Sequence, residues 1–236
     1  MKHNPNQSRT NIENYIKNST SDTLLSEERV WASNSLKAYL IDTLPENIKL
    51  DNILTTVERT LPDSILSIID SIYIGDFEEL RERDIQSMWK NGAIYTTNNQ
   101  ENDMDMIEDI IHEFAHAIED VKGLELYSDQ SIETEFLQKR RHLYDILLSH
   151  GLADNIEPFM STAYDIEFDK YLHETVGYEK LEFLTMGLFV TPYSATALRE
   201  YWAEGFEEYY MPSGDRTALR QMSPAIYSKI EELNNE

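Results

Sequence analysis

A His-Glu-x-x-His motif, His112-Glu113-Phe114-Ala115-His116, constrains this chain more than any other feature of its sequence. The motif lies in a segment with helical periodicity, and two histidines four residues apart project from the same side of a helix. Two imidazoles so placed can bind one zinc ion, and the glutamate beside the first can act as a base on a water molecule. The motif therefore predicts a metal site with hydrolytic chemistry.

The sequence around the motif argues against coincidence. The chain has 6 histidines in 236 residues, and the expected number of chance matches is roughly 0.015, so luck is a poor explanation. Asp103 and Asp105 offer N-cap chemistry and favourable charge at the start of the helix. The apolar residues that recur at helical spacing are Met104, Ile107, Ile110, Ile111, Phe114, Ala115 and Ile118, and they predict a buried face. The alternative is a surface helix with two solvated histidines.

The composition narrows the functional classes. A net charge of −24, from 44 acidic and 20 basic residues, repels phosphate backbones and anionic lipid surfaces, so we expect neither nucleic acid nor membrane as a partner. The absence of cysteine excludes disulfides, thiolate metal ligands and a cysteine nucleophile. A hydrophobic content of 41% with 14 tyrosines is sufficient for a sizeable core.

The ends of the chain and its hydropathy bear on location. The first residues are polar and include no apolar signal-peptide core, and no apolar run approaches the length of a membrane span. We therefore expect a soluble protein that is cytoplasmic as synthesised, with association with a virion as an open option. Residues 1–22 form a polar arm that could serve protein assembly.

Turn and capping signals predict an α+β fold, predominantly helical, with a small mixed β-sheet before the metal-binding helix. Asn91-Gly92 between two apolar runs predicts a β-hairpin, since both turn positions need positive φ. The predicted division is a polar arm over 1–22, a helical region over 23–69 and a catalytic domain over 70–236. Expected elements before the motif are helices over 26–44 and 50–61 and strands over 71–75, 84–90 and 93–97.

The chain after residue 103 is expected to be helical throughout. A long helix begins after Ser128-Asp129 and ends at Gly151. Pro224 is suited to the first turn of the last helix. The other helices are expected over 167–176, 178–188 and 196–210.

A catalytic zinc site needs a third protein ligand, and the residues alone leave three candidates. These are His173, Glu200 and Glu204. Two carboxylates four residues apart lie on one helix face, so that the first can bind zinc while the second accepts the ring N–H of a ligand histidine. Glu200 with Glu204 has this spacing, and so does Glu204 with Glu208. The alternative for this segment is an acidic face exposed to solvent.

Three features together resemble the gluzincin metallopeptidases, and among them the family of the anthrax lethal factor catalytic domain and the bacterial Pro-Pro endopeptidases. They are the motif at 112–116, the segment Glu200-Tyr201-Trp202-Ala203-Glu204-Gly205-Phe206, and Tyr193, seven residues before Glu200. The resemblance covers roughly residues 70 to 211. The segment from His116 to Glu200 is longer here than in that family, so the resemblance implies a helical insertion near 129–150. The sequence is also similar, more weakly, to uncharacterised phage-encoded proteins predicted to be metallopeptidases.

The resemblance implies a zincin-like fold and a zinc-dependent endopeptidase with one Zn²⁺ per chain. It implies that His112, His116 and Glu200 bind zinc, and that Glu204 orients a ligand histidine. Glu113 would be the general base, and Tyr193 would donate to the oxyanion of the transition state. An edge strand, with 93–97 as the candidate, would pair with an extended peptide or protein substrate.

A non-enzymatic protein is the competing hypothesis. The zinc site could stabilise a structural or interaction protein, such as a virion component or a pseudopeptidase. A site that opens to a cleft beside Glu113 favours the enzyme, and a site filled by protein groups favours the structural alternative. A third idea, a toxin acting inside target cells, rests on family analogy alone.

Overall fold

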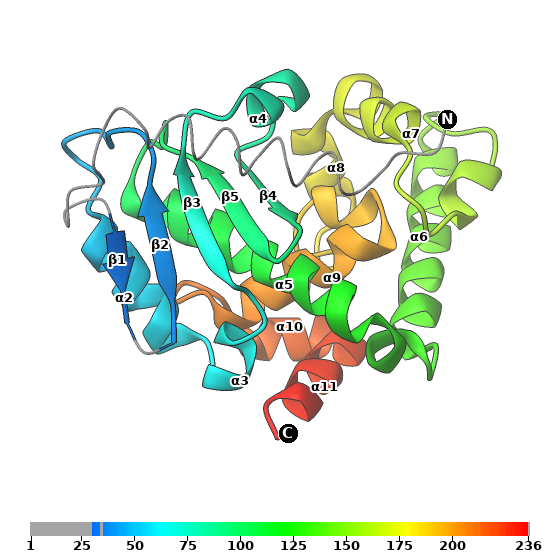
Figure 1. Ribbon diagram of the computed structural model, residues 1–236. Helices are drawn as coiled ribbons and strands as arrows, with labels where there is room; N and C mark the ends of the chain where they lie inside the picture. Colours follow the sequence, from blue (N-terminus) through cyan, green and yellow to red (C-terminus); the bar gives the residue numbers. More distant parts are fainter. Residues whose placement is uncertain (1–29, 34, 236) are drawn as a thin grey trace, which may run out of the picture.

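A five-stranded mixed sheet forms one half of the fold, with helices behind it and the helical second half of the chain beside it (Figure 1). This computed structural model describes residues 30–33 and 35–235. The strand order is β1-β2-β3-β5-β4. Strands β2, β3 and β5 run parallel, while β1 and β4 pair antiparallel at the two edges. The strands are β1 (Val30–Ala32), β2 (Lys37–Leu40), β3 (Ser71–Gly75), β4 (Ser87–Lys90) and β5 (Ala93–Thr97). The predicted helix-rich fold with a small mixed sheet is confirmed.

The helix predicted over 26–44 is wrong, because Val30–Ala32 and Lys37–Leu40 form strands β1 and β2. The Ser33 hydroxyl accepts from the Leu36 N–H at 3.0 Å and stabilises the turn between the strands. Strand β2 then fills the open edge of β3, where Ala38 is fully buried. Pairing with a distant strand has outweighed a local helical pattern. The polar arm over 1–22 and the capping signal at Ser26–Arg29 lie outside the described residues.

The predicted strand over 71–75 and the hairpin at Asn91-Gly92 are confirmed. Asn91 and Gly92 have φ angles of 52° and 86°, as the turn requires. A side chain at position 92 would also collide with Asp70, since an added Cβ would lie 2.7 Å from its carboxylate. The first hairpin strand is shorter than predicted and begins at Ser87.

The two faces of the sheet are packed differently. On one face lie α2 (Leu50–Thr60), α3 (Asp63–Leu66) and α5 (Asp103–Tyr127), over the fully buried Ile72 and Ile94. On the other face Tyr39, Tyr73 and Tyr95 stack across neighbouring strands, with 5.2 Å between successive ring centroids. Helix α4 (Glu78–Arg83) covers the end of this tyrosine row. The sheet thus supports α5, the helix with the motif, from one side.

The second half of the chain is helical, as predicted, and packs beside α5 (Figure 1). The expected helix over 167–176 is α7 followed by a π-helical segment at Tyr171–Gly177, and α10 was not predicted. None of the described helices is both long enough and apolar enough to cross a membrane. The main helices here are α6 (Ser131–Ser149), α7 (Ile166–Lys170), α8 (Tyr178–Leu184), α9 (Leu198–Tyr210), α10 (Arg216–Met222) and α11 (Pro224–Leu233).

Helix α9 is fixed against α5 and α11 by two close contacts. The buried Trp202 indole N–H donates to the Ala115 carbonyl in the middle of α5, at 3.0 Å. One turn further along α9, Gly205 meets Ile226 of α11 so closely that an added Cβ would lie 2.7 Å from a methyl carbon. The small residue between Glu204 and Phe206 is therefore required by the packing of α9 on α11.

Replacing Gly205 by alanine should destabilise the fold by about 1–3 kcal/mol, because the new methyl group overpacks the contact with Ile226. Urea unfolding measures this change. Gly123→Ala is the matched control, since this helical glycine has nothing within 4 Å of an added Cβ. Alanine there should be neutral or slightly stabilising. Equal stability of the two variants would contradict the close packing of α9 on α11.

Candidate metal centre

Helix α5 carries the motif between the sheet and α9. The Asn102 side chain caps the helix by accepting from the N–H groups of Met104 and Asp105, at 2.8 and 3.2 Å. The predicted cap at Asp103 or Asp105 is thus wrong by one to three residues, although both acids lie in the first turn. The buried face is as predicted except for Met104, which is 39% exposed.

His112, His116 and Glu200 converge on one point between α5 and α9. The Glu200 Oε2 atom lies 3.3 Å from His112 Nε2 and 3.4 Å from His116 Nε2. Tetrahedral zinc with bonds of about 2.0–2.1 Å places neighbouring donor atoms roughly 3.3–3.4 Å apart. Glu200 and His116 are each 6% exposed. In donor type, in burial and in the distance from Glu200 to each histidine, these three residues suit a metal ion, and they could hold one.

Two acids on α9 approach the other ring nitrogen of His112. Glu207 Oε2 lies 3.2 Å from His112 Nδ1, while Glu204 Oε1 lies 3.7 Å away. The second oxygen of Glu204 instead accepts a hydrogen bond from the Thr191 hydroxyl at 2.7 Å. The acceptor closest to His112 Nδ1 is therefore Glu207 and not the predicted Glu204.

The outer nitrogen of His116 has a looser environment. His116 Nδ1 is buried and has no hydrogen-bond partner among the residues that the structure describes. The nearest acid is Glu119, whose Oε2 atom lies 3.7 Å from it, beyond hydrogen-bond distance. A small movement of Glu119 would supply the acceptor that a metal-binding histidine usually has.

The histidines and carboxylates of the cluster shift one another's pKa values. Burial lowers the pKa of His112, but hydrogen bonds to Glu200 and Glu207 outweigh it and raise the pKa well above its usual value. Burial raises the pKa of Glu200, and the hydrogen bonds to His112 and His116 outweigh it and lower the pKa. Burial and the charge of Glu207 raise the pKa of Glu204. A cation at this point would replace the histidine protons as the partner of these carboxylates.

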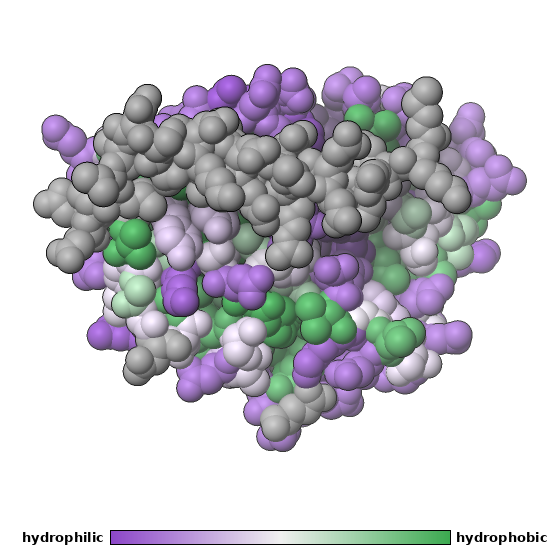
Figure 2. Space-filling model, viewed as in Figure 1, coloured by the Kyte–Doolittle hydropathy of each residue, from purple (hydrophilic) through white to green (hydrophobic). Residues whose placement is uncertain are grey.

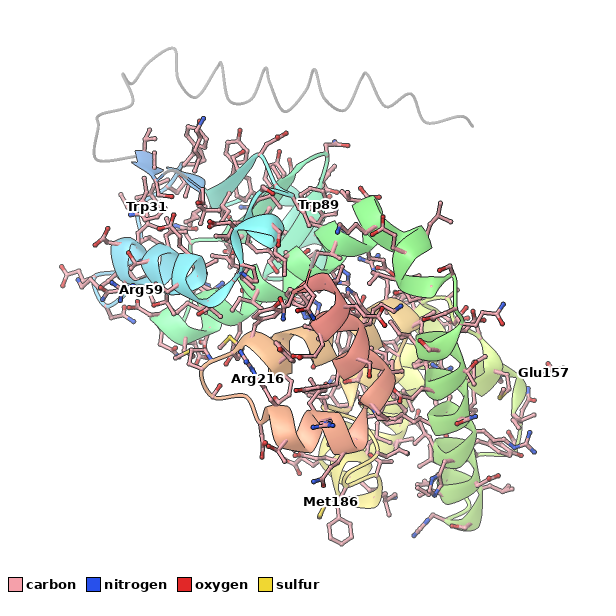
Figure 3. All side chains as sticks on the ribbon, turned by 90° about the horizontal axis from the view of Figure 1, so that it is seen from below. Trp31, Arg59, Trp89, Glu157, Met186 and Arg216 are labelled. Atoms are coloured by element: carbon pink, nitrogen blue, oxygen red, sulfur yellow. The ribbon has the colours of Figure 1, made fainter. Side chains whose placement is uncertain are left out.

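Glu113 faces the edge of the sheet. Its carboxylate is buried and accepts hydrogen bonds from the Ser87 hydroxyl at 2.9 Å and from the Trp89 backbone N–H at 2.5 Å. The Trp89 indole N–H donates to Asp120, 3.3 Å away and two turns further along α5. Figure 3 shows Trp89 beside the α5 ribbon, across the molecule from Met186. Strand β4 therefore holds the side chain that the motif predicts as a base.

Tyr193 lies close enough to Glu200 to feel its charge. Burial and then the charge of Glu200 raise the pKa of the Tyr193 hydroxyl far above its usual value. The hydroxyl thus stays protonated at neutral pH and can donate a hydrogen bond. Tyr193 belongs to a short 3₁₀ turn, Tyr193–Ala195, directly before α9.

A buried arginine fixes the loop between this turn and α9. Arg140 on α6 is 1% exposed. It donates to the carbonyls of Ala195 and Thr196, at 2.6 and 3.1 Å. It also donates to the carbonyls of Pro158 and Phe159, and its guanidinium carbon lies 4.0 Å from the centroid of the Phe168 ring. Helix α6 therefore holds the loop that carries Tyr193.

Two sequence-based candidates lie elsewhere. His173 is exposed and stacks edge-on against Tyr178 with 4.9 Å between ring centroids, so it does not join the metal cluster. The candidate edge strand over 93–97 is wrong, because β5 lies between β3 and β4. The edge next to the motif is β4. Sequence reasoning also missed Glu207, although its position three residues after Glu204 places it on the same face of α9.

Comparisons with models of known protein families, with curated proteins and with solved structures gave no match. The likeness to the lethal factor family therefore rests on the motifs and on their spacing. What the geometry establishes is a largely buried cluster of two histidines and a glutamate that could hold a metal ion. Glu113 follows His112 in the sequence, and the charge of Glu200 acts on the pKa of Tyr193.

Proposed function

We propose that this protein is a zinc-dependent endopeptidase of the zincin type. The observation that carries the proposal is that Glu200 Oε2 lies 3.3 Å from His112 Nε2 and 3.4 Å from His116 Nε2, the spacing of neighbouring ligand atoms around tetrahedral zinc. Three protein ligands leave one position for a water or substrate, as catalytic zinc sites do, whereas structural sites use four. The mixed sheet beside the motif helix is in keeping with this class.

Each side chain of the site has a role in peptide hydrolysis under this proposal. His112, His116 and Glu200 hold zinc, which when bound makes water acidic enough to react near neutral pH and polarises a carbonyl group. Glu113 takes the proton of the attacking water and returns it to the leaving amine. Tyr193 donates to the oxygen of the peptide carbonyl as negative charge develops there. Glu207 holds the ring of His112 through Nδ1.

Strand β4 is the candidate platform for the peptide. It is an edge strand and lies next to α5. The Trp89 N–H of this edge is taken by Glu113. An extended peptide can pair with the other outward-facing backbone groups of β4, so that its scissile bond lies over the motif helix. The net charge of −24 would raise the association rate of positively charged substrates.

Digestion of a diverse peptide library by zinc-loaded protein tests the proposal. We expect cleavage at a restricted set of bonds, loss of cleavage after chelation and recovery when zinc is added back. Mass spectrometry of the products reports the bonds that are cut. A zinc-loaded, folded protein that cuts no peptide in the library would contradict the proposed endopeptidase activity.

A structural metal site is the second candidate. It is favoured by the contacts of Glu113, since both of its carboxylate oxygens already accept hydrogen bonds from β4. Under this alternative, Glu113 joins the helix to the sheet and zinc joins α5 to α9. Its expected signature is a large loss of thermal stability on zinc removal, with no hydrolysis in the presence of zinc.

A further inference from the structure

We infer that Ser87 is a positioning residue for Glu113, which it holds together with the Trp89 backbone N–H at the edge of β4 that faces away from β5. The inference rests on the proposed function, because Glu113 needs a fixed orientation only if it acts as a base. Neither donor belongs to the metal ligands or to the motif. Both come from the edge strand that precedes the motif by more than twenty residues.

The pairing of β4 explains why its donors face Glu113. The Thr97 N–H donates to the Gln86 carbonyl at 2.8 Å, and hydrogen-bonded pairs alternate with non-bonded pairs in an antiparallel ladder. Ser87 and Trp89 occupy non-bonded positions opposite Thr96 and Ile94. Their backbone groups therefore point away from β5, and there the Trp89 N–H donates a hydrogen bond to the Glu113 carboxylate.

The side chains of β4 divide in the same way. Met88 packs with Leu80 and Tyr95 on the face of the sheet away from α5. Side chains alternate between faces along a strand, so Ser87 and Trp89 turn to the α5 side. There the Ser87 hydroxyl reaches Glu113 Oε1 at 2.9 Å. The Ser87 hydroxyl thus donates to one oxygen of the Glu113 carboxylate, and the Trp89 backbone N–H donates to the other.

These two hydrogen bonds fix the plane of the Glu113 carboxylate and leave it able to accept further hydrogen bonds. Each oxygen of an ionised carboxylate has two lone-pair sites, so one accepted hydrogen bond leaves one site free. Glu113 is 5% exposed, and a buried carboxylate with neither donor would lose both its partners and its orientation. A catalytic group displaced by about 1 Å can cost on the order of 10²-fold in rate.

Two other hydrogen bonds join β4 to α5 and do not depend on Ser87. The Trp89 indole N–H donates to Asp120 at 3.3 Å, and the Trp89 backbone N–H keeps its own bond to Glu113. Loss of the Ser87 hydroxyl should therefore leave strand and helix in place while loosening one carboxylate oxygen. A role limited to stability would not predict a specific effect on turnover.

Ser87→Val and Ser87→Thr form a matched pair, since the two new side chains have almost the same shape and only threonine keeps the hydroxyl. We expect Ser87→Val to lower kcat about ten-fold with KM changed less than about two-fold, because one hydrogen bond to a charged group is lost. Ser87→Thr should retain most of the wild-type kcat. Ser87→Ala repeats the test without the added methyl group.

Hydrogen exchange of the Trp89 amide gives a readout that needs no activity. We expect the amide to exchange about ten-fold faster in Ser87→Val than in Ser87→Thr, as Glu113 is released. Zinc affinity, measured by titration, should be the same in both variants. Equal kcat and equal exchange in Ser87→Val and Ser87→Thr would overturn the inference. A wild-type protein without hydrolysis would overturn the proposed function, and the exchange rates would still decide whether Ser87 holds Glu113.

Discussion

Glu113→Gln should bind zinc as tightly as the wild type and lose at least about 10³-fold in kcat, because an amide cannot take a proton from water. The fold should survive the change. The new amide oxygen can accept from the Trp89 N–H, while the new NH₂ group donates to the Ser87 hydroxyl, which becomes the acceptor. Both contacts of Glu113 to β4 are thereby kept in another form.

Steady-state kinetics on a cleaved peptide measure the loss, with zinc content determined on the same samples. Glu125→Gln is the matched control, because Glu125 belongs to the same helix and its side chain is 62% exposed. This control should keep wild-type rates. Wild-type turnover in Glu113→Gln would remove its assigned role and point to another base.

Glu200→Ala should weaken zinc binding by about 10²–10³-fold. Structural zinc sites with four protein ligands contribute about 10–16 kcal/mol, or roughly 2.5–4 kcal/mol per ligand, and we expect the loss of Glu200 to cost about as much as one such ligand. The Glu200→Ala substitution also removes the carboxylate oxygen that lies near the Nε2 atoms of both His112 and His116. Competition with a chelator of known affinity measures the change.

The other acids of α9 should have smaller effects in a defined order. Glu207→Ala should weaken zinc binding about ten-fold, since it removes the acceptor 3.2 Å from His112 Nδ1. Glu204→Ala should cost less, because its nearest oxygen lies 3.7 Å away and its other oxygen binds Thr191. A larger loss in Glu204→Ala than in Glu200→Ala would exchange the two assignments.

Features with short-range physical causes could be predicted from the sequence. The hairpin at Asn91-Gly92 follows from the positive φ angles of its turn. The buried face of α5 follows from helical periodicity, and the convergence of His112 and His116 follows from their spacing of four residues. The choice of Glu200 as the third member of the cluster came from the resemblance, and the geometry places it there.

Features that depend on distant partners could not be predicted in this way. Val30–Ala32 and Lys37–Leu40 are strands because β2 pairs with β3, which lies more than thirty residues further along the chain. Local sequence patterns do not reveal such a pairing. Glu207, and not Glu204, lies nearest to His112 Nδ1 because two contacts fix the rotation of α9 about its axis. Trp202 of α9 packs on α5, and Gly205 of α9 packs on α11. The contact between Ser87 and Glu113 depends on which strand lies at the edge of the sheet.

Zinc titration of the purified, metal-free protein tests the central claim most directly. One equivalent of zinc per chain is expected to bind tightly, with the coordination of two imidazoles and one carboxylate visible by X-ray absorption spectroscopy. The ligands would be His112, His116 and Glu200. A correctly folded chain that binds no zinc, or binds it with the same affinity after Glu200→Ala, would contradict the proposed site.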